Sequence, residues 1–212
     1  MRRPVCPNDL DIAFARRLVR YLGGDPSKIE DDDCWESLAQ KFPELIAAAE
    51  DYFASTRTGD PAWAAYRMCL DCGSTRGWAE GLIRRTKTGD QASAAYYMCI
   101  YCGSAPEWAE AVIERARTGD PAWAAYRMCR DFGSPRWWAE GVIERATVGD
   151  PAWAAYFMCC DFGSDREWAE GVIGHAKTGD PARAARWMCR GPGSDREWAR
   201  GMARKHAGKE GE

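Results

Sequence analysis

Two Cys-x-x-Cys motifs are the part of the sequence whose residue types and spacing could perform chemistry. The motifs read CLDC and CIYC and contain Cys69, Cys72, Cys99 and Cys102. Paired thiolates at this spacing are typical ligands of tetrahedral zinc and of iron–sulfur clusters. The four cysteines therefore leave open a metal-binding or redox function, in which the metal would be zinc or iron.

A comparison of the chain with itself at intervals of 30 residues favours a structural role for these thiols. Cys72 and Cys102 occupy the position that Phe132 and Phe162 fill in later copies. A position shared by Cys and Phe is typical of a hydrophobic core, where Cys behaves as a small apolar residue. Neighbouring helices also lie about 8–10 Å apart, beyond the Cα separation of about 7 Å that a disulfide tolerates. We therefore expect buried, reduced thiols and no cofactor.

No other group of residues forms a catalytic constellation. The two histidines, His175 and His206, lack an evident pairing with a Ser, a Cys or a carboxylate. The GxxxxGK(S/T), GxGxxG and HExxH motifs are also missing from the sequence. We therefore predict no catalytic residues and expect a protein that is not an enzyme.

The composition indicates a globular chain. Its 212 residues are 46% hydrophobic and 12% aromatic, which is more apolar than a disordered segment allows. The net charge of −3 supplies no positive field that would favour nucleic acid or an anionic membrane. The sequence contains neither the apolar segment of a secretory signal nor a run of 18 apolar residues. We therefore expect a cytoplasmic protein with reduced cysteines and no membrane partner.

A tandem repeat of 30 residues organises most of the chain. Gly-Asp recurs at 59, 89, 119, 149 and 179, and the copies that start at 119 and 149 differ at only eight of their 30 positions. In four of the five copies Pro follows the Asp, and Asp as N-cap with Pro as first helical residue is a typical helix start. Apolar residues then recur at i, i+3, i+4 and i+7. A first helix is therefore predicted in every copy.

The second half of each copy predicts a second helix. A Gly-Ser pair follows the first helix, and the Ser is expected to be the N-cap of the next one. Three copies carry Ser and Glu at capping-box spacing, namely Ser104 with Glu107, Ser164 with Glu167, and Ser194 with Glu197. A small residue in mid-helix, such as Gly141, is expected to allow close helix contact. Each copy is thus predicted to be a helical hairpin.

Hairpins of this size bury their apolar faces only by stacking on one another. The predicted fold is therefore all-α, an α-solenoid of five tandem 30-residue helical-hairpin repeats with a helical N-terminal cap. The predicted parts are the cap at 1–58, the repeats at 59–88, 89–118, 119–148, 149–178 and 179–208, and a polar tail at 209–212. Gly24, Asp25 and Pro26 form a possible degenerate copy of the repeat start within the cap.

The Asp-Pro start, the paired helices and the length of the unit resemble the HEAT-like repeats of the phycobilisome-lyase type. The resemblance covers residues 59–208 and extends to architecture alone. It implies a binding scaffold and no catalytic residue. Because equivalent residues of a solenoid form rows on its surface, a binding function would appear as a row rather than as a local motif.

An aromatic row on the first helices is the leading candidate for binding a protein or peptide. Trp and Tyr anchor many protein interfaces. The alternative is that the row packs between repeats and has only a structural role. The six candidate residues are Trp63, Tyr66, Trp123, Tyr126, Trp153 and Tyr156.

Two charged rows lie on the second helices. The acidic row comprises Glu80, Glu110, Glu140 and Glu170, and we expect it to face solvent. The basic row comprises Arg85, Arg115, Arg145, His175 and Lys205. Together with the excess of basic residues in 179–208, this row leaves nucleic-acid binding open, although Glu114 and Glu144 lie beside it. Head-to-tail self-association of the acidic cap with the basic end is a further alternative.

Overall fold

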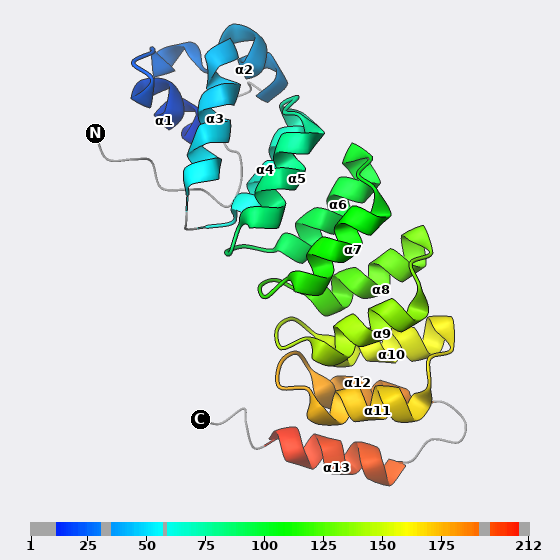
Figure 1. Ribbon diagram of the computed structural model, residues 1–212. Coiled ribbons are helices and arrows are strands. Elements are labelled where there is room, and N and C mark those ends of the chain that lie inside the picture. Colours follow the sequence, from blue (N-terminus) through cyan, green and yellow to red (C-terminus); the bar gives the residue numbers. More distant parts are fainter. Residues whose placement is uncertain (1–11, 31–34, 57–58, 191–195, 208–212) are drawn as a thin grey trace. The chain divides into compact units, whose positions relative to one another are not determined.

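The computed structural model of the chain describes residues 12–30, 35–56, 59–190 and 196–207, and all regular structure in these ranges is helical (Figure 1). The chain divides into two compact units, residues 1–112 and 113–212. In both units, helices that are consecutive in sequence pack side by side. The predicted all-α solenoid of helical repeats is thereby confirmed.

The first unit begins with the helical cap. Its helices are α1 (Ile12–Tyr21), α2 (Trp35–Lys41) and α3 (Pro43–Ser55). Phe14 of α1 and Phe53 of α3 are fully buried with ring centroids 5.3 Å apart, so they form the centre of the cap. Asp25 accepts the backbone N–H of Ser27, yet only the short 3-10 helix Pro26–Lys28 follows it. The degenerate repeat start therefore caps a single turn and not a full helix.

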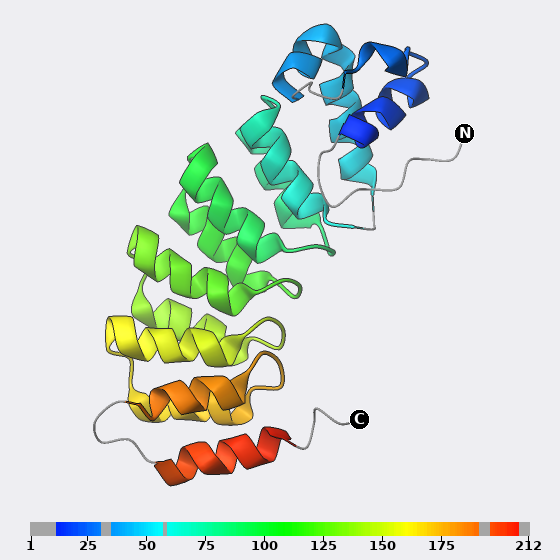
Figure 2. The ribbon, with the colours of Figure 1, turned by 180° about the vertical axis from the view of Figure 1, so that it is seen from behind.

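Two helices correspond to each of the five predicted repeats. The first helices are α4 (Pro61–Asp71), α6 (Gln91–Cys102), α8 (Pro121–Phe132), α10 (Pro151–Phe162) and α12 (Pro181–Met188). The second helices are α5 (Arg76–Arg85), α7 (Pro106–Arg115), α9 (Arg136–Arg145), α11 (Arg166–His175) and α13 (Arg196–Ala207). In the second unit α9 and α11 lie nearest the viewer in Figure 1, and α10 and α12 lie nearest in Figure 2. The first helices stack on one another, α4 on α6 and α8 on α10 on α12.

The Gly-Asp pair begins each first helix and also joins it to the repeat before it. Asp150 accepts the backbone N–H of Trp153 at 3.0 Å, which caps α10. The backbone N–H of Asp150 in turn donates to the carboxylate of Asp120 at 3.1 Å. Gly149 has a φ of 76°, and a Cβ there would lie 2.3 Å from Oδ1 of Asp120. The pair recurs because both the local cap and the contact between repeats require it.

The predicted start of the second helices is wrong by one residue. Thr75, Pro135 and Asp165 are the N-cap residues of α5, α9 and α11. The serine before the N-cap is buried and belongs to the turn, where the N–H of Ser134 donates to the carbonyl of Met128 at 3.3 Å. A left-handed Gly133 ends α8, so the chain needs one more residue before it can enter the next helix.

The predicted capping boxes are accordingly replaced by other contacts. The hydroxyl of Ser104 donates to Glu80 of the preceding repeat at 2.7 Å. The α11 helix is capped by Asp165, which accepts the N–H of Trp168 at 3.0 Å. Ser194 of the third predicted box lies outside the described residues.

The apolar stripes lie where the periodicity places them. Met128, Cys129, Val142 and Ile143 are buried, and the alanines of α4, α6, α8 and α10 are almost completely buried. The mid-helix glycines do not have the predicted role in close helix contact. A Cβ at Gly171 would have no heavy atom within 4 Å beyond its immediate chain neighbours and its own helix backbone, so this position lies in open space.

Candidate functional site

The predicted aromatic row lies on the first helices, with Trp63 and Tyr66 in the first unit and the other four residues in the second. Two of its three tyrosines are buried, which differs from an exposed binding row, and Tyr156 is half-buried. Tyr66 is 5% exposed and Tyr126 is 3% exposed, whereas the tryptophans are half-buried. Within each copy the Trp and Tyr rings touch, as in Trp123 and Tyr126 with centroids 5.0 Å apart. The row therefore packs between repeats and also presents ring edges at the surface.

Two aromatic residues that the sequence analysis missed complete the row in the second unit. The ring of Phe157 lies 5.6 Å from Trp123 and 5.4 Å from Trp153, between one repeat and the next. Trp187 is 37% exposed, and its ring lies 6.2 Å from Trp153. A signal was present in the sequence, because Tyr97, Phe157 and Trp187 occupy equivalent positions.

The first unit carries a smaller aromatic cluster of its own. Tyr97 stacks on Tyr66 at 5.6 Å and contacts Trp63 at 5.4 Å. Tyr101 stacks on Tyr97 at 6.0 Å and is 58% exposed. Leu70 of α4 is also exposed. This cluster is mainly apolar, in contrast to the row of the second unit.

Arginine side chains cover the aromatic row of the second unit. The guanidinium of Arg183 lies 5.1 Å from the centroid of Trp153, and that of Arg190 lies 3.9 Å from Trp187. Cations over aromatic rings are held by the negative face of the ring. We call this surface the aromatic–arginine face. It consists of Trp123, Tyr126, Arg127, Arg130, Trp153, Tyr156, Phe157, Arg183, Trp187 and Arg190.

A hydrogen bond ties this face together across two repeats. The hydroxyl of Tyr126 donates to Asp161 at 2.7 Å. Arg130 donates to both oxygens of Asp131 at 2.7 and 3.0 Å. Burial, and then the hydrogen bond to Asp161, raises the pKa of Tyr126. The tyrosine is therefore a neutral donor over the physiological pH range.

The four cysteines of the alternative metal site are free thiols on α4 and α6 or at the end of these helices. Cys72 and Cys99 are buried as expected, whereas Cys69 and Cys102 are only half-buried. Burial raises the pKa of Cys72, Cys99 and Cys102 to about 12 each. A thiol must lose its proton to bind a metal or to react, so such a shift opposes both. Across the described ranges, no group of three or more His, Cys, Asp or Glu side chains could hold a metal ion. Within the described residues these thiols therefore do not belong to a ready-made group of metal ligands.

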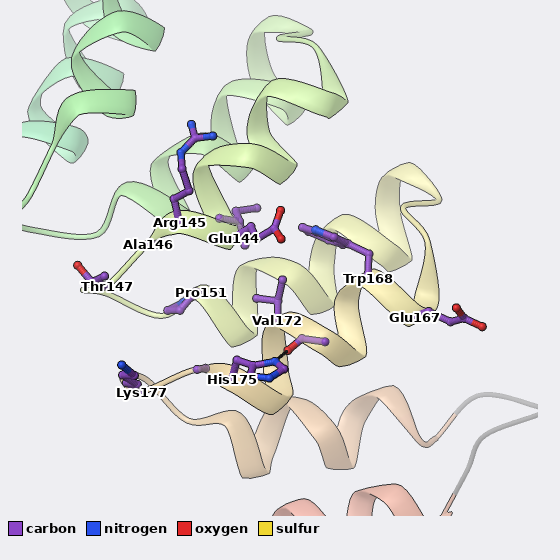
Figure 3. Close-up of a pocket in the computed structure, with 13 residues that line it drawn as sticks. Glu144, Arg145, Ala146, Thr147, Pro151, Glu167, Trp168, Val172, His175 and Lys177 are labelled. Carbon is purple, nitrogen blue, oxygen red and sulfur yellow. Dashed lines mark hydrogen bonds between the residues drawn. The ribbon is translucent and has the colours of Figure 1, made fainter.

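The second helices of the second unit border a groove of about 530 Å³ (Figure 3). Ile143, Pro151 and Val172 contribute apolar surface to it, and Trp168 lies along one wall. The carboxylate of Glu144 points toward the Trp168 ring in Figure 3. The groove thus combines apolar residues with charged residues of both signs.

The predicted basic row contributes two residues to this groove, but they do not form a positive track. Arg145 pairs with Glu114 at 3.3 Å and points away from the groove (Figure 3). A hydrogen bond of 2.8 Å joins Nδ1 of His175 to the carbonyl of Gly171. With Glu144 on the opposite wall, the charges at the groove partly cancel.

The acidic row is half-buried, which differs from the predicted solvent-facing row. The side chains of Glu80, Glu140 and Glu170 are 23–24% exposed. Each pairs with an arginine four residues earlier, as in Arg166 and Glu170 at 2.7 Å. These carboxylates therefore stabilise their own helices, and Glu80 also accepts a hydrogen bond from the next repeat.

Comparisons with protein families, with curated proteins and with solved structures found no match. None of the helices described here is both long and apolar enough to cross a membrane.

Proposed function

We propose that the chain is a non-catalytic, HEAT-like repeat scaffold that binds a protein or peptide on its aromatic–arginine face. The supporting observation is the row of six aromatic rings across α8, α10 and α12, with arginine guanidinium groups over four of them. Trp, Tyr and Arg are the residues that contribute most to binding energy at protein interfaces. Rings that are already ordered by their neighbours lose little side-chain entropy when a partner binds.

The buried rings and the exposed rings of this face have different roles in the proposal. The buried Tyr126 and the half-buried Phe157 contact each other between adjacent repeats. Trp187 and the exposed arginines Arg130, Arg183 and Arg190 present the contact surface. A substitution at Tyr126 would disturb the fold together with any binding. The useful probe residue is therefore Trp187, which is exposed.

The experiment is a selection of random peptides on the immobilised full chain. Peptides that are enriched on the wild type are expected to bind the Trp187→Ala variant more weakly. Trp137→Ala is the matched control, because Trp137 is 74% exposed and lies on α9, outside the face. Failure to enrich any peptide, or equal loss of binding in both variants, would contradict the proposal.

A further inference from the structure

The α10–α12 end of the aromatic–arginine face differs in charge from the rest of the aromatic row. Arg183 and Arg186 stand at the positions that Trp153 and Tyr156 occupy one repeat earlier. Both arginines are exposed, as is Arg190 one turn further along the chain. The last repeat thus replaces two aromatic residues by cations while it keeps an exposed Trp187 beside them.

The three guanidinium groups are available to a partner. Arg186 donates to the carbonyl of Ala182 on its own helix, and Arg183 and Arg190 lie over aromatic rings. Among the described residues, no carboxylate lies within ion-pair distance of any of the three.

The nearest acidic residues of these helices are already engaged. Asp180 caps α12 by accepting the N–H of Arg183 at 2.8 Å. Asp161 accepts the hydroxyl of Tyr126. The α12 helix carries Arg183 and Arg186 and no acidic residue, so its surface has an excess of positive charge beside the exposed Trp187.

We propose that this α10–α12 end binds an acidic peptide segment that also carries an apolar side chain. Carboxylates of the segment would pair with Arg183, Arg186 and Arg190, because guanidinium groups bind carboxylates in a bidentate geometry. The apolar side chain would contact Trp187. The inference rests on the proposed scaffold function and names the chemistry of its partner.

The ring arrangement favours an acidic peptide over a single-stranded nucleic acid. Base stacking requires an open ring face, and Arg190 covers one face of the Trp187 ring at 3.9 Å. Trp153 is in contact with Arg183 and with three neighbouring rings. Asp131 and Asp161 further interrupt the positive charge along α8 and α10, whereas a phosphate backbone needs a continuous positive track.

The test uses the full chain and the peptides enriched in the selection described above. The enriched peptides are expected to contain an excess of Asp and Glu beside Phe, Leu or Tyr. An acidic peptide should bind at least about tenfold more tightly than its Asn/Gln counterpart, and high salt should weaken it. The triple variant Arg183→Glu/Arg186→Glu/Arg190→Glu should lose this preference.

The matched control is Arg84→Glu/Lys87→Glu/Lys177→Glu, which makes the same change in net charge at exposed positions outside the face. It is expected to bind like the wild type, and circular dichroism checks that both variants are folded. Equal affinity for acidic and neutral peptides would overturn the inference alone. Enrichment of no peptide would overturn the scaffold function as well. Displacement of the acidic peptide by oligothymidine at physiological salt, with tighter binding of the oligonucleotide, would overturn the inference in favour of nucleic acid.

Discussion

The carboxylate of Asp120 accepts two backbone N–H groups that belong to different repeats. One oxygen accepts the N–H of Trp123 at 3.0 Å, and the other accepts the N–H of Asp150 at 3.1 Å. Asp60 bonds Trp63 and Asp90 in the same way in the first unit. A single carboxylate thus starts a helix and also joins it to the following repeat.

Replacing Asp120 by Ala should cost more than the loss of an ordinary helix cap. We expect the free energy of unfolding to fall by about 2–3 kcal/mol, because the N-cap bond is removed and the N–H of Asp150 is left without its acceptor. Asp165→Ala is the matched control, since Asp165 caps α11 by one bond to Trp168. It should cost about 1 kcal/mol. Urea denaturation of the two variants measures the difference, and equal losses would contradict the role of Asp120 between repeats.

Two glycines in the second unit should respond to Ala in opposite directions. Gly149→Ala should destabilise the protein by more than about 1–2 kcal/mol, because its φ of 76° is left-handed and the new Cβ would meet the Asp120 carboxylate. Gly171→Ala should stabilise it by up to about 1 kcal/mol, because this glycine is helical and has open space around it. Thermal unfolding of both variants checks the signs. A stabilised Gly149→Ala variant would show that the contact between repeats is not tight.

Cysteine labelling should separate exposed from buried thiols. Cys160 is exposed, whereas Cys72 and Cys99 are buried and their pKa values are raised to about 12 by burial. We expect iodoacetamide to modify Cys160 in the native protein at neutral pH, and to reach Cys72 and Cys99 only after unfolding. Mass spectrometry of timed samples provides the measurement. Rapid native labelling of Cys72 would mean that α4 opens at its end.

The free energy of unfolding should fall above about pH 9. Burial raises the pKa of the Cys102 thiol from its ordinary 9.0 to about 12, so the unfolded chain loses this proton first. The stabilisation by the protonated Cys102 thiol is complete at pH values below its ordinary pKa of 9.0. It is lost as the pH rises toward about 12, the pKa of this thiol in the folded protein. Cys102→Phe introduces the residue that the later repeats carry at this position. In this variant the free energy of unfolding should fall less steeply with pH in the alkaline range. Denaturation curves between pH 7 and pH 11 test this, and an unchanged slope would contradict it.

Two aromatic residues should differ sharply in their effect on stability. Tyr126→Ala should cost about 3–5 kcal/mol, since the ring is buried between repeats. Trp137→Ala should change stability by no more than about 0.5 kcal/mol, because its ring is mostly exposed. Chemical denaturation of the two variants is the measurement. A small loss of stability in Tyr126→Ala would show that the ring is not needed for packing between repeats and is available to bind a partner.

Much of the fold follows from the sequence because its signals are local. Asp followed by Pro specifies a helix start through hydrogen bonds within one turn, and the apolar period specifies which face is buried. The identity of the copies then predicts that hairpins stack. The start of the second helices was missed by one residue because Gly133 and Ser134 form a turn that the capping-box pattern does not describe.

The candidate site depended more strongly on the tertiary structure. Local signals in the sequence specify the helical hairpins, their 30-residue period and the residue types in each row, since these follow from backbone hydrogen bonding and periodicity. Only the tertiary structure decided that Tyr126 is buried, that Glu170 is half-buried in an ion pair, and that Trp187 and Arg190 are exposed together. The physical reason is that exposure depends on the distance and angle between neighbouring repeats, and those are set by packing between residues 30 positions apart.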